Sequence, residues 1–436
     1  MNMKFRYSIH TLKNGMQVVL APTNKINSVT VQATIKAGTV YENPQDNGIT
    51  HFLEHVSLIG TKSHPDKFEL SEFLDQNGAD SNGSTSAEQL RYYIEIPYTK
   101  IDLGLDFIYE VLYAPSFNES YINLERSIIL DEISKNENNI YTKAARYFNE
   151  IILGTNNPYY YEILGPAENV RNFSLDFIEA NYKKIHNPNR VILSVVGKFD
   201  ENKVLKEIKK LYEPMKSTTF TSKFEDCPIQ TSKTGVKYDK KSDLVICDIY
   251  FKLPRTSEFD YKEKILIGEI CNILAGPLCS RLKKRLREKE GILYSIFTGI
   301  TDAYTHGMLY IAFEVPPALF KKTLNIVFEE LNILVKEGID EKELNRYKDF
   351  VRNREILYYD KIHSTVGRLL IYPLFYKTRD IMSYEKLTKI FYDTTPEAMS
   401  KLSSKYIKLN EASVLGYGNV NKSTHDIIKE VVNKYR

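Results

Sequence analysis

The stretch Ser28-Val-Thr-Val-Gln-Ala-Thr-Ile-Lys36 resembles a later stretch of the same chain, Leu244-Val-Ile-Cys-Asp-Ile-Tyr-Phe-Lys252, at an offset of 216 positions, from 28 to 244. Both are rich in β-branched and aromatic residues, which is typical of β-strands. Two further matches at nearly the same offset pair Leu58-Ile-Gly60 with Leu274-Ala-Gly276 and Ser194-Val-Val-Gly197 with Ser413-Val-Leu-Gly416. Because self-similarity at a fixed period indicates repeated structural units, the sequence predicts two homologous halves.

Each half is predicted to have an α+β fold. Other strands are expected at Met16–Pro22, Arg91–Pro97 and Val191–Val196, and helices at Gly48–Ile59, Lys67–Asn77, Ile101–Tyr113, Ser120–Leu153 and Leu175–Lys184. Strands in mixed order with clustered helices favour a largely antiparallel sheet packed with helices. Residues 213–235 are polar and rich in Ser, Thr and Lys, as a surface linker would be. We therefore expect an N-terminal domain over residues 1–212, this linker, and a C-terminal domain over residues 236–436.

Composition excludes several classes of protein. The 436 residues carry 59 Lys and Arg against 56 Asp and Glu, a net charge of +3, so no basic stripe indicates nucleic-acid binding. No uncharged stretch reaches the roughly 18 residues of a membrane span, so we expect no membrane-spanning helix. The cysteines, Cys227, Cys247, Cys271 and Cys279, lack the CxxC spacing of a redox pair. We expect buried thiols in a reducing cytoplasm.

One motif in the first half carries metal chemistry. His51-Phe-Leu-Glu54-His55 lies in a predicted helix, so that the two histidines, four residues apart, project from one face and can bind one metal ion. Glu54 lies at the edge of that face, where a carboxylate can take a proton from water beside the ion. This H-x-x-E-H order is the inverse of the common H-E-x-x-H zinc motif. It indicates a metal-dependent hydrolase.

A zinc site of this kind needs a third protein ligand. The best candidates lie in the long helical stretch, where Glu125 and Glu132 are seven residues apart and therefore on one face. Apolar neighbours should bury that side, and a buried carboxylate needs a metal or a ligating histidine to compensate it. The competing interpretation is that both acids lie on a solvated helix face.

His51-x-x-Glu54-His55, followed 77 positions after His55 by Glu132, resembles the inverzincin zinc site of the pitrilysin/insulinase family of metallopeptidases. The resemblance implies that His51, His55 and Glu132 are the ligands of one Zn²⁺ per chain. It implies that Glu54 is the general base and that Glu125 is a second acid that supports the site. Length and the two-half organisation point to the branch similar to mitochondrial processing peptidase and its bacterial relatives.

Two other regions are similar to blocks of this family. Asn82, Gly83, Ser84 and Thr85, before a strand, resemble the segment that pairs with an extended substrate. The block Ser280-Arg-Leu-Lys-Lys-Arg-Leu-Arg287-Glu-Lys-Glu-Gly-Ile-Leu-Tyr294 resembles one whose Arg and Tyr reach across to the active site, and the resemblance gives Arg287 and Tyr294 roles in binding the substrate carbonyl and stabilising its oxyanion.

The sequence departs from the family pattern in three places. The glycine run that often precedes the Ser-Arg-Leu is replaced by Gly276-Pro277-Leu278-Cys279, and the usual Asn-Ala of the substrate strand reads Asn82-Gly83. At the repeat offset, the motif residues His51, Glu54 and His55 correspond to Ile267, Ile270 and Cys271. The second half is therefore expected to bind no metal.

The family implies an overall function and a set of alternatives. We expect a cytoplasmic zinc endopeptidase whose halves form a clamshell around a chamber that takes peptides or unfolded polypeptide segments. Family members of this size commonly pair, so the sequence favours a homodimer, with the catalytic subunit of a heterodimer as the alternative. Two further alternatives stay open: a dedicated protease that matures a small peptide, and a non-catalytic scaffold.

Overall fold

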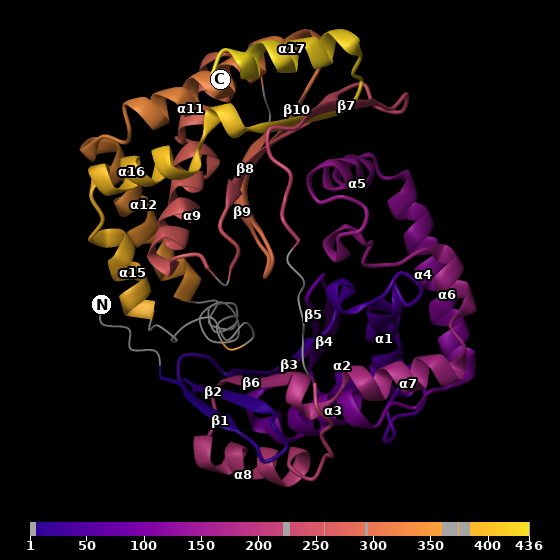
Figure 1. Cartoon of the computed structure of the whole chain (residues 1–436). Coiled ribbons are helices and arrows are strands. Elements are labelled where there is room, and N and C mark those ends of the chain that lie inside the picture. Colours follow the sequence, from indigo (N-terminus) through magenta and orange to yellow (C-terminus); the bar gives the residue numbers. More distant parts are fainter. Residues whose placement is uncertain are drawn as a thin grey trace. The chain divides into compact units, whose positions relative to one another are not determined.

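A computed structural model describes residues 6–220, 227–256, 258–292, 295–359, 374 and 384–435 (Figure 1). They form two compact units. The first is built mainly from residues 6–136 and 161–220, and the second from residues 137–160, 227–356 and 384–435. This division differs from the expected domain boundaries because it assigns residues 137–160 to the second unit.

The first unit contains a six-stranded sheet in the order β1-β2-β6-β3-β5-β4. Its strands are β1 (Ser8–Thr11), β2 (Gln17–Pro22), β3 (Ser28–Lys36), β4 (Asp80–Thr85), β5 (Gln89–Pro97) and β6 (Val191–Gly197). β2 and β6 are parallel, and every other neighbouring pair is antiparallel. This arrangement makes β4 an edge strand, whose outer backbone groups are not paired within this sheet.

The second unit repeats this sheet with five strands in the order β7-β11-β8-β10-β9. They are β7 (Thr234–Tyr238), β8 (Val245–Leu253), β9 (Ile296–Asp302), β10 (Gly307–Val315) and β11 (Ser413–Gly418). One pair, β7 and β11, is again parallel and the others are antiparallel. Strands β2, β6, β3, β5 and β4 thus correspond in order to β7, β11, β8, β10 and β9. The predicted α+β fold of two homologous halves is confirmed.

Helices cover the first sheet as their apolar periodicity requires. They are α1 (Ile49–Ser57), α2 (Lys67–Gln76), α3 (Ile101–Tyr113), α4 (Glu119–Asn138), α6 (Ala167–Asn172), α7 (Leu175–Ile185) and α8 (Glu201–Tyr212). Buried residues of α3 such as Leu105 and Ile108 join the same core as Val31 of β3 and Ile94 of β5. Burial of this apolar surface fixes the helices on the sheet.

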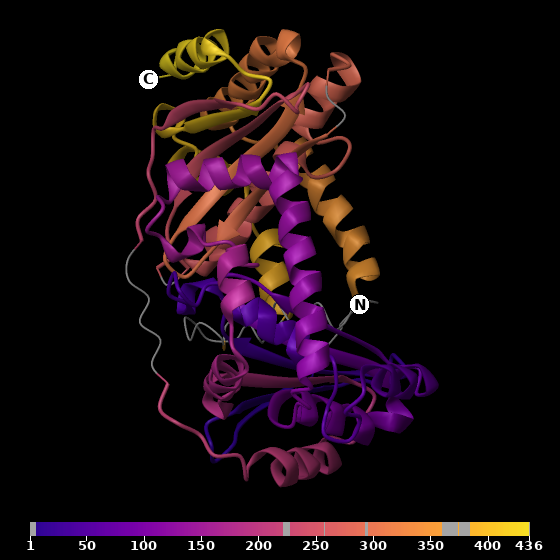
Figure 2. The same ribbon diagram turned by 90° about the vertical axis from the view of Figure 1, so that its right-hand side faces the viewer.

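The predicted long helix Ser120–Leu153 is wrong in one respect, because it breaks at Asn139. The Asn139 side chain accepts hydrogen bonds from the backbone N–H groups of Tyr141 (2.8 Å) and Thr142 (3.2 Å), so it caps a new helix, α5 (Ile140–Ile152). Buried residues of α5, including Phe148, pack against the second sheet (Figure 2). This packing explains why residues 137–160 belong to the second unit.

The remaining helices lie almost wholly in the second unit. They are α9 (Tyr261–Ala275), α10 (Arg281–Lys283), the π-helical turn η5 (Lys284–Lys289), α11 (Pro317–Lys336), α12 (Glu341–Tyr359), α15 (Tyr384–Tyr392), α16 (Pro396–Tyr406) and α17 (Lys422–Asn433). Short 3₁₀ turns are η1 (Thr39–Tyr41), η2 (Tyr98–Lys100), η3 (Pro158–Tyr160), η4 (Pro188–Arg190) and η7 (Leu409–Glu411). The expectation of four buried thiols is wrong for two cysteines. Cys247 and Cys271 are buried, but Cys227 is partly exposed and Cys279 is exposed.

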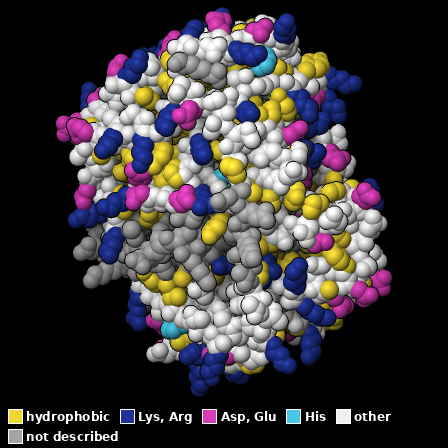
Figure 3. Space-filling view, in the orientation of Figure 1, with side chains coloured by type: hydrophobic (Ala, Val, Ile, Leu, Met, Phe, Trp, Pro, Cys, Tyr) yellow, Lys and Arg dark blue, Asp and Glu magenta, His cyan; other side chains and the backbone are white. Residues whose placement is uncertain are grey.

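The surface agrees with the balanced charge of the chain. On the face shown in Figure 3, basic and acidic side chains of the described residues lie among one another. Within the described part of the chain, we find no helix of the length and apolar character that a membrane crossing requires.

Replacing Phe148 with Ala tests the assignment of α5 to the second unit. Phe148 is 1% exposed, and removing a buried phenylalanine side chain costs about 3–5 kcal/mol. We expect faster hydrogen exchange in β8 and β11, measured by mass spectrometry of peptides, with β3 and β5 unchanged. The control Glu150→Ala, at an exposed position of α5, should leave both sheets unchanged. Faster exchange confined to β3 and β5 would contradict the assignment.

Candidate metal centre

Helix α1, which carries the H-x-x-E-H motif, begins at a fixed point. Gly48 precedes it with a φ of 98°, and a Cβ there would lie 2.6 Å from the backbone oxygen of Leu164, so glycine is required. The carboxylate of Glu42 accepts hydrogen bonds from the backbone N–H groups of Gly48 (3.0 Å) and Thr50 (2.9 Å). A negative group at a helix N-terminus stabilises it. The first turn of α1 is therefore anchored immediately before His51.

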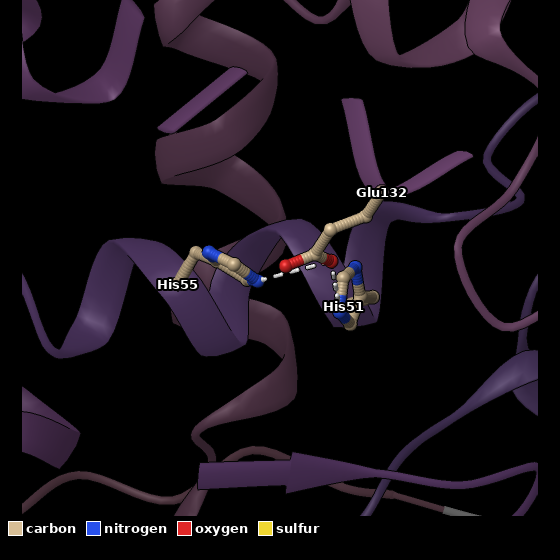
Figure 4. Close-up of side chains that lie close together, drawn as sticks. All are labelled: His51, His55 and Glu132. Atoms are coloured by element: carbon tan, nitrogen blue, oxygen red, sulfur yellow. Dashed lines mark ion pairs between the residues drawn. The ribbon is translucent and has the colours of Figure 1, made fainter. Parts of the chain in front are cut away.

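His51 and His55 of α1 and Glu132 of α4 lie together (Figure 4). Glu132 Oε2 is 3.8 Å from His51 Nε2 and 3.9 Å from His55 Nε2. One potential ligand atom from each of the three residues lies within 4.8 Å of the other two. Among the described residues, this is the one group of three or more His, Cys, Asp or Glu side chains with such geometry. The structure thus brings together the three residues that the resemblance selected.

The donor atoms fit a zinc ion. Two imidazole nitrogens and one carboxylate oxygen are a known catalytic zinc set that leaves a fourth position for water. Burial, and then the nearby His55, lower the pKa of His51 to about 3, so its ring is neutral, as a ligand must be. His51 Nδ1 is buried and has no hydrogen-bond partner among the described residues. If Nδ1 carries the proton of the neutral ring, the lone pair of Nε2 is available to bind a cation.

Glu125 of α4 supports the site from behind His55. Its side chain is 5% exposed, and its Oε2 lies 2.8 Å from His55 Nδ1. Because a carboxylate only accepts hydrogen bonds, Nδ1 carries the proton and Nε2 faces the metal position. The second oxygen, Oε1, accepts a hydrogen bond from Lys67 Nζ of α2 at 2.5 Å. Burial works to raise the pKa of Glu125, but the hydrogen bonds from His55 and Lys67 outweigh it and lower the pKa.

The acids around His55 also act on its ring. Burial by itself would lower the pKa of His55, but the hydrogen bond to Glu125 and the negative charges of Glu132, Glu125 and Glu54 raise it. The ring must give up its Nε2 proton to a metal, so binding of a metal here releases a proton.

Glu54 is held between α1 and β4. Its Oε2 accepts a hydrogen bond of 2.5 Å from the hydroxyl of Thr85. A Cβ on Gly83 would lie 2.6 Å from Glu54 Cγ, so the glycine leaves room for this side chain against the strand. Burial raises the pKa of Glu54, although the Thr85 hydrogen bond opposes the shift. The departure from the family's Asn-Ala at positions 82 and 83 therefore coincides with a close contact to Glu54.

Four of the six residues predicted to bind substrate, Asn82 to Thr85, lie on the edge strand β4, which contacts α1. Thr85 touches Glu54, whereas the Ser84 hydroxyl accepts a hydrogen bond from Arg91 Nε of the neighbouring strand at 3.2 Å. The side chain of Asn82 accepts from the backbone N–H of Gly83 at 2.8 Å. The unpaired outer edge of β4 therefore lies next to the helix that carries the metal motif.

The structure describes only one residue of the pair predicted from the second half, Arg287 and Tyr294. Arg287 lies in η5 of the second unit, with its side chain 43% exposed and its Nε 3.5 Å from Glu288 Oε1. Tyr294 lies outside the described residues. The equivalents of the motif residues, Ile267, Ile270 and Cys271, are all buried in the core of the second unit.

Sequence reasoning missed Lys67 and Glu42. Each contacts the motif region from another element: Lys67 through Glu125, and Glu42 through the first turn of α1. A Glu in a loop is ordinary in sequence, and a Lys at the start of a helix is a weak signal because acidic residues are preferred there. The predicted burial of Glu125, which requires a compensating partner, was the other available signal.

Comparison with known proteins identifies the family of this chain. Residues 17–166 match the model of insulinase, peptidase family M16, and residues 172–351 match that of the peptidase M16 inactive domain. The chain therefore belongs to peptidase family M16, the insulinase and pitrilysin family. The match of the second half to the inactive domain agrees with the apolar residues found there at the motif positions.

Named relatives support the same family, and a solved structure shows the same fold. The chain is 25% identical over 359 residues to the uncharacterized zinc protease YmxG of Bacillus subtilis, covering 82% of this chain and 86% of that protein. It is 29% identical over 223 residues to a probable mitochondrial-processing peptidase subunit beta of Arabidopsis thaliana, covering 49% and 40% respectively. The crystal structure of a protease from Helicobacter pylori has the same fold, with a TM-score of 0.82 at 22% identity over 95% of this chain and 100% of that chain.

Replacing His51 with Ala should remove zinc from the protein. The variant keeps only one imidazole and Glu132 in the group, and two ligands hold zinc far more weakly than three. Elemental analysis of purified protein should show close to one zinc per wild-type chain and almost none in the variant. The control His64→Ala changes a histidine outside the group, whose ring centroid lies 4.2 Å from that of Phe73, and it should keep its zinc. Equal zinc in both variants would refute the site.

Proposed function

We propose that this protein is a zinc-dependent endopeptidase that hydrolyses peptides or unfolded polypeptide segments. The observation that carries the proposal is the convergence of His51, His55 and Glu132 beside the carboxylate of Glu54. When bound, zinc supplies Lewis acidity that polarises a carbonyl oxygen and makes nearby water more acidic. The name zinc protease, given to relatives such as YmxG, supports this choice of metal.

Glu54 is the proposed general base. Its raised pKa brings the carboxylate closer to the working range of a base near neutral pH. In the proposed reaction, a Glu54 oxygen accepts a proton from the attacking water and passes it to the nitrogen of the leaving amine. The hydroxyl of Thr85 donates to Oε2 and orients the carboxylate, which leaves Oε1 available for the proton.

The edge strand β4 is the proposed site of substrate binding. An extended peptide that pairs with Asn82–Thr85 would gain backbone hydrogen bonds with little dependence on its side chains. Such a peptide would lie along the strand that carries Thr85 and Gly83, next to Glu54. Because a folded protein does not offer a free extended segment, this mode selects peptides and unfolded chains. Arg287 and Tyr294 are proposed to bind the substrate carbonyl, as the family resemblance implies.

The proposed assembly is a homodimer in the cytoplasm. The similarity to a protein named as a subunit of mitochondrial-processing peptidase favours one alternative, that the chain is the catalytic member of a heterodimer. A dedicated peptide-maturation protease would use the same site on a narrower substrate. A non-catalytic scaffold is the remaining alternative, which observed peptide cleavage would exclude.

Replacing Glu54 with Gln should separate metal binding from catalysis. The amide cannot accept the proton from water, and loss of a general base lowers rates about 10²–10⁴-fold. We expect zinc content equal to that of the wild type and kcat/KM reduced by that factor for a quenched fluorescent peptide. Glu69→Gln, an exposed carboxylate in the first turn of α2, is the matched control and should cleave normally.

Two results would change the proposal. Cleavage by the Glu54→Gln variant at the wild-type rate would remove Glu54 from the reaction. Zinc-loaded wild-type protein that cleaves no peptide in a diverse library, alone or with a homologous partner chain, would favour the scaffold.

A further inference from the structure

Glu125 carries a negative charge in a place that water hardly reaches. Its side chain is 5% exposed and has two charged or chargeable neighbours among the described residues, His55 and Lys67. A buried charge is costly unless it is paired and hydrogen-bonded. When His55 ligates a metal through Nε2, its ring is neutral and its Nδ1–H supplies a hydrogen bond without a formal charge. Lys67 then supplies the formal positive charge that directly contacts Glu125.

The position of Lys67 runs against the local preference of its helix. Lys67 is the first residue of α2, directly after the capping residue Asp66. The N-terminus of a helix has a partial positive charge, so a cation there is electrostatically unfavourable. A residue that is unfavourable for its own helix is expected where its side chain makes a contact that another part of the structure needs. Here the other part is Glu125, whose Oε1 lies 2.5 Å from Lys67 Nζ.

A second contact fixes Lys67 in front of Glu125. The Tyr121 hydroxyl donates a hydrogen bond to Asp66 Oδ2, while Asp66 Oδ1 accepts from the backbone N–H of Phe68 at 2.8 Å. Tyr121 and Glu125 are four residues apart on α4 and therefore share a face. Their partners, Asp66 and Lys67, are adjacent at the start of α2. The two contacts therefore tie α2 to α4 in one register, with the ammonium group placed on the carboxylate.

We propose that Lys67 is a positioning residue of the metal centre, which holds the Glu125 carboxylate directed at His55 Nδ1. This hold fixes the tautomer of His55 and turns its Nε2 toward the position shared with His51 and Glu132. The inference rests on the proposed zinc site and adds to it a residue that does not touch the metal. Its consequence is tighter binding of zinc.

The test compares the zinc affinity of Lys67→Met with that of Lys67→Arg, using competition with a chromophoric chelator. Met keeps most of the side-chain length without the charge, and Arg keeps the charge. Partners of metal ligands contribute about 10–100-fold to metal affinity. We expect Lys67→Met to weaken zinc binding by at least about tenfold and Lys67→Arg to restore most of the affinity. Thermal unfolding of the metal-free proteins checks that both variants are folded.

A second pair of variants separates positioning from simple structural support. In a Glu125→Gln background, Lys67→Met should cause little further loss of zinc affinity, because the carboxylate that Lys67 holds is already gone. The control Lys183→Met removes a lysine of α7 that pairs with Glu179 at 3.5 Å on an exposed surface, and it should bind zinc as the wild type does.

Several outcomes would overturn the inference. Zinc affinity unchanged in Lys67→Met, or losses that simply add in the double variant, would show that Lys67 does not act through Glu125. A wild type that binds no zinc would overturn both this inference and the proposed function. A wild type that binds zinc without cleaving peptides would count against the proposed function alone, because the affinities still decide the role of Lys67.

Discussion

The arrangement of the first unit depends on how buried polar groups of α1 and α4 satisfy one another. His51 and Glu125 are 9% and 4% exposed, and both lie in helices that pack against a hydrophobic core. Glu125 is compensated by His55 and Lys67, whereas His51 Nδ1 has no partner among the described residues. Unpaired polar atoms are costly to bury, so the hydrogen bonds from His55 and Lys67 are what stabilise the buried carboxylate of Glu125.

Equivalent positions in the two units show that the same fold can hold either a candidate metal site or an apolar core. The strands of the two units follow the same order and the same parallel and antiparallel pairing. In the first unit, α1 presents His51 and His55 to a partner carboxylate, whereas in the second unit the equivalent positions on α9, Ile267 and Cys271, are buried among apolar residues. Apolar side chains there need no partners, so burial of surface area alone stabilises the second unit at this position.

The edge strand connects the metal centre to the chemistry that we propose. Thr85 on β4 uses its side chain to hold Glu54, and Gly83 provides space for it. The backbone of the same strand is unpaired along its outer edge within the sheet. One short strand can therefore orient the base and bind an extended chain, which brings the peptide bond and the carboxylate close together without a separate binding loop.

Local sequence determined much of this protein by itself. The strand Ser28–Lys36 and the helix Ile101–Tyr113 have the bounds that periodicity predicted, and the spacing of His51 and His55 was sufficient to place both rings on one face of a helix. These features depend on residues close together in the chain, where a period of two or 3.6 residues directly sets which side chains share a face. The family resemblance was needed to choose Glu132 over Glu125 as the third ligand.

Only the tertiary structure decided the rest. The Asn139 cap starts α5 as a new helix, but it is packing against the second sheet that makes α5 part of the other unit. The contacts Lys67–Glu125 and Thr85–Glu54 join residues 58 and 31 positions apart, for which no local period exists. They form because folding brings α2, α4, β4 and α1 together, and a buried charge then takes the nearest group that can compensate it.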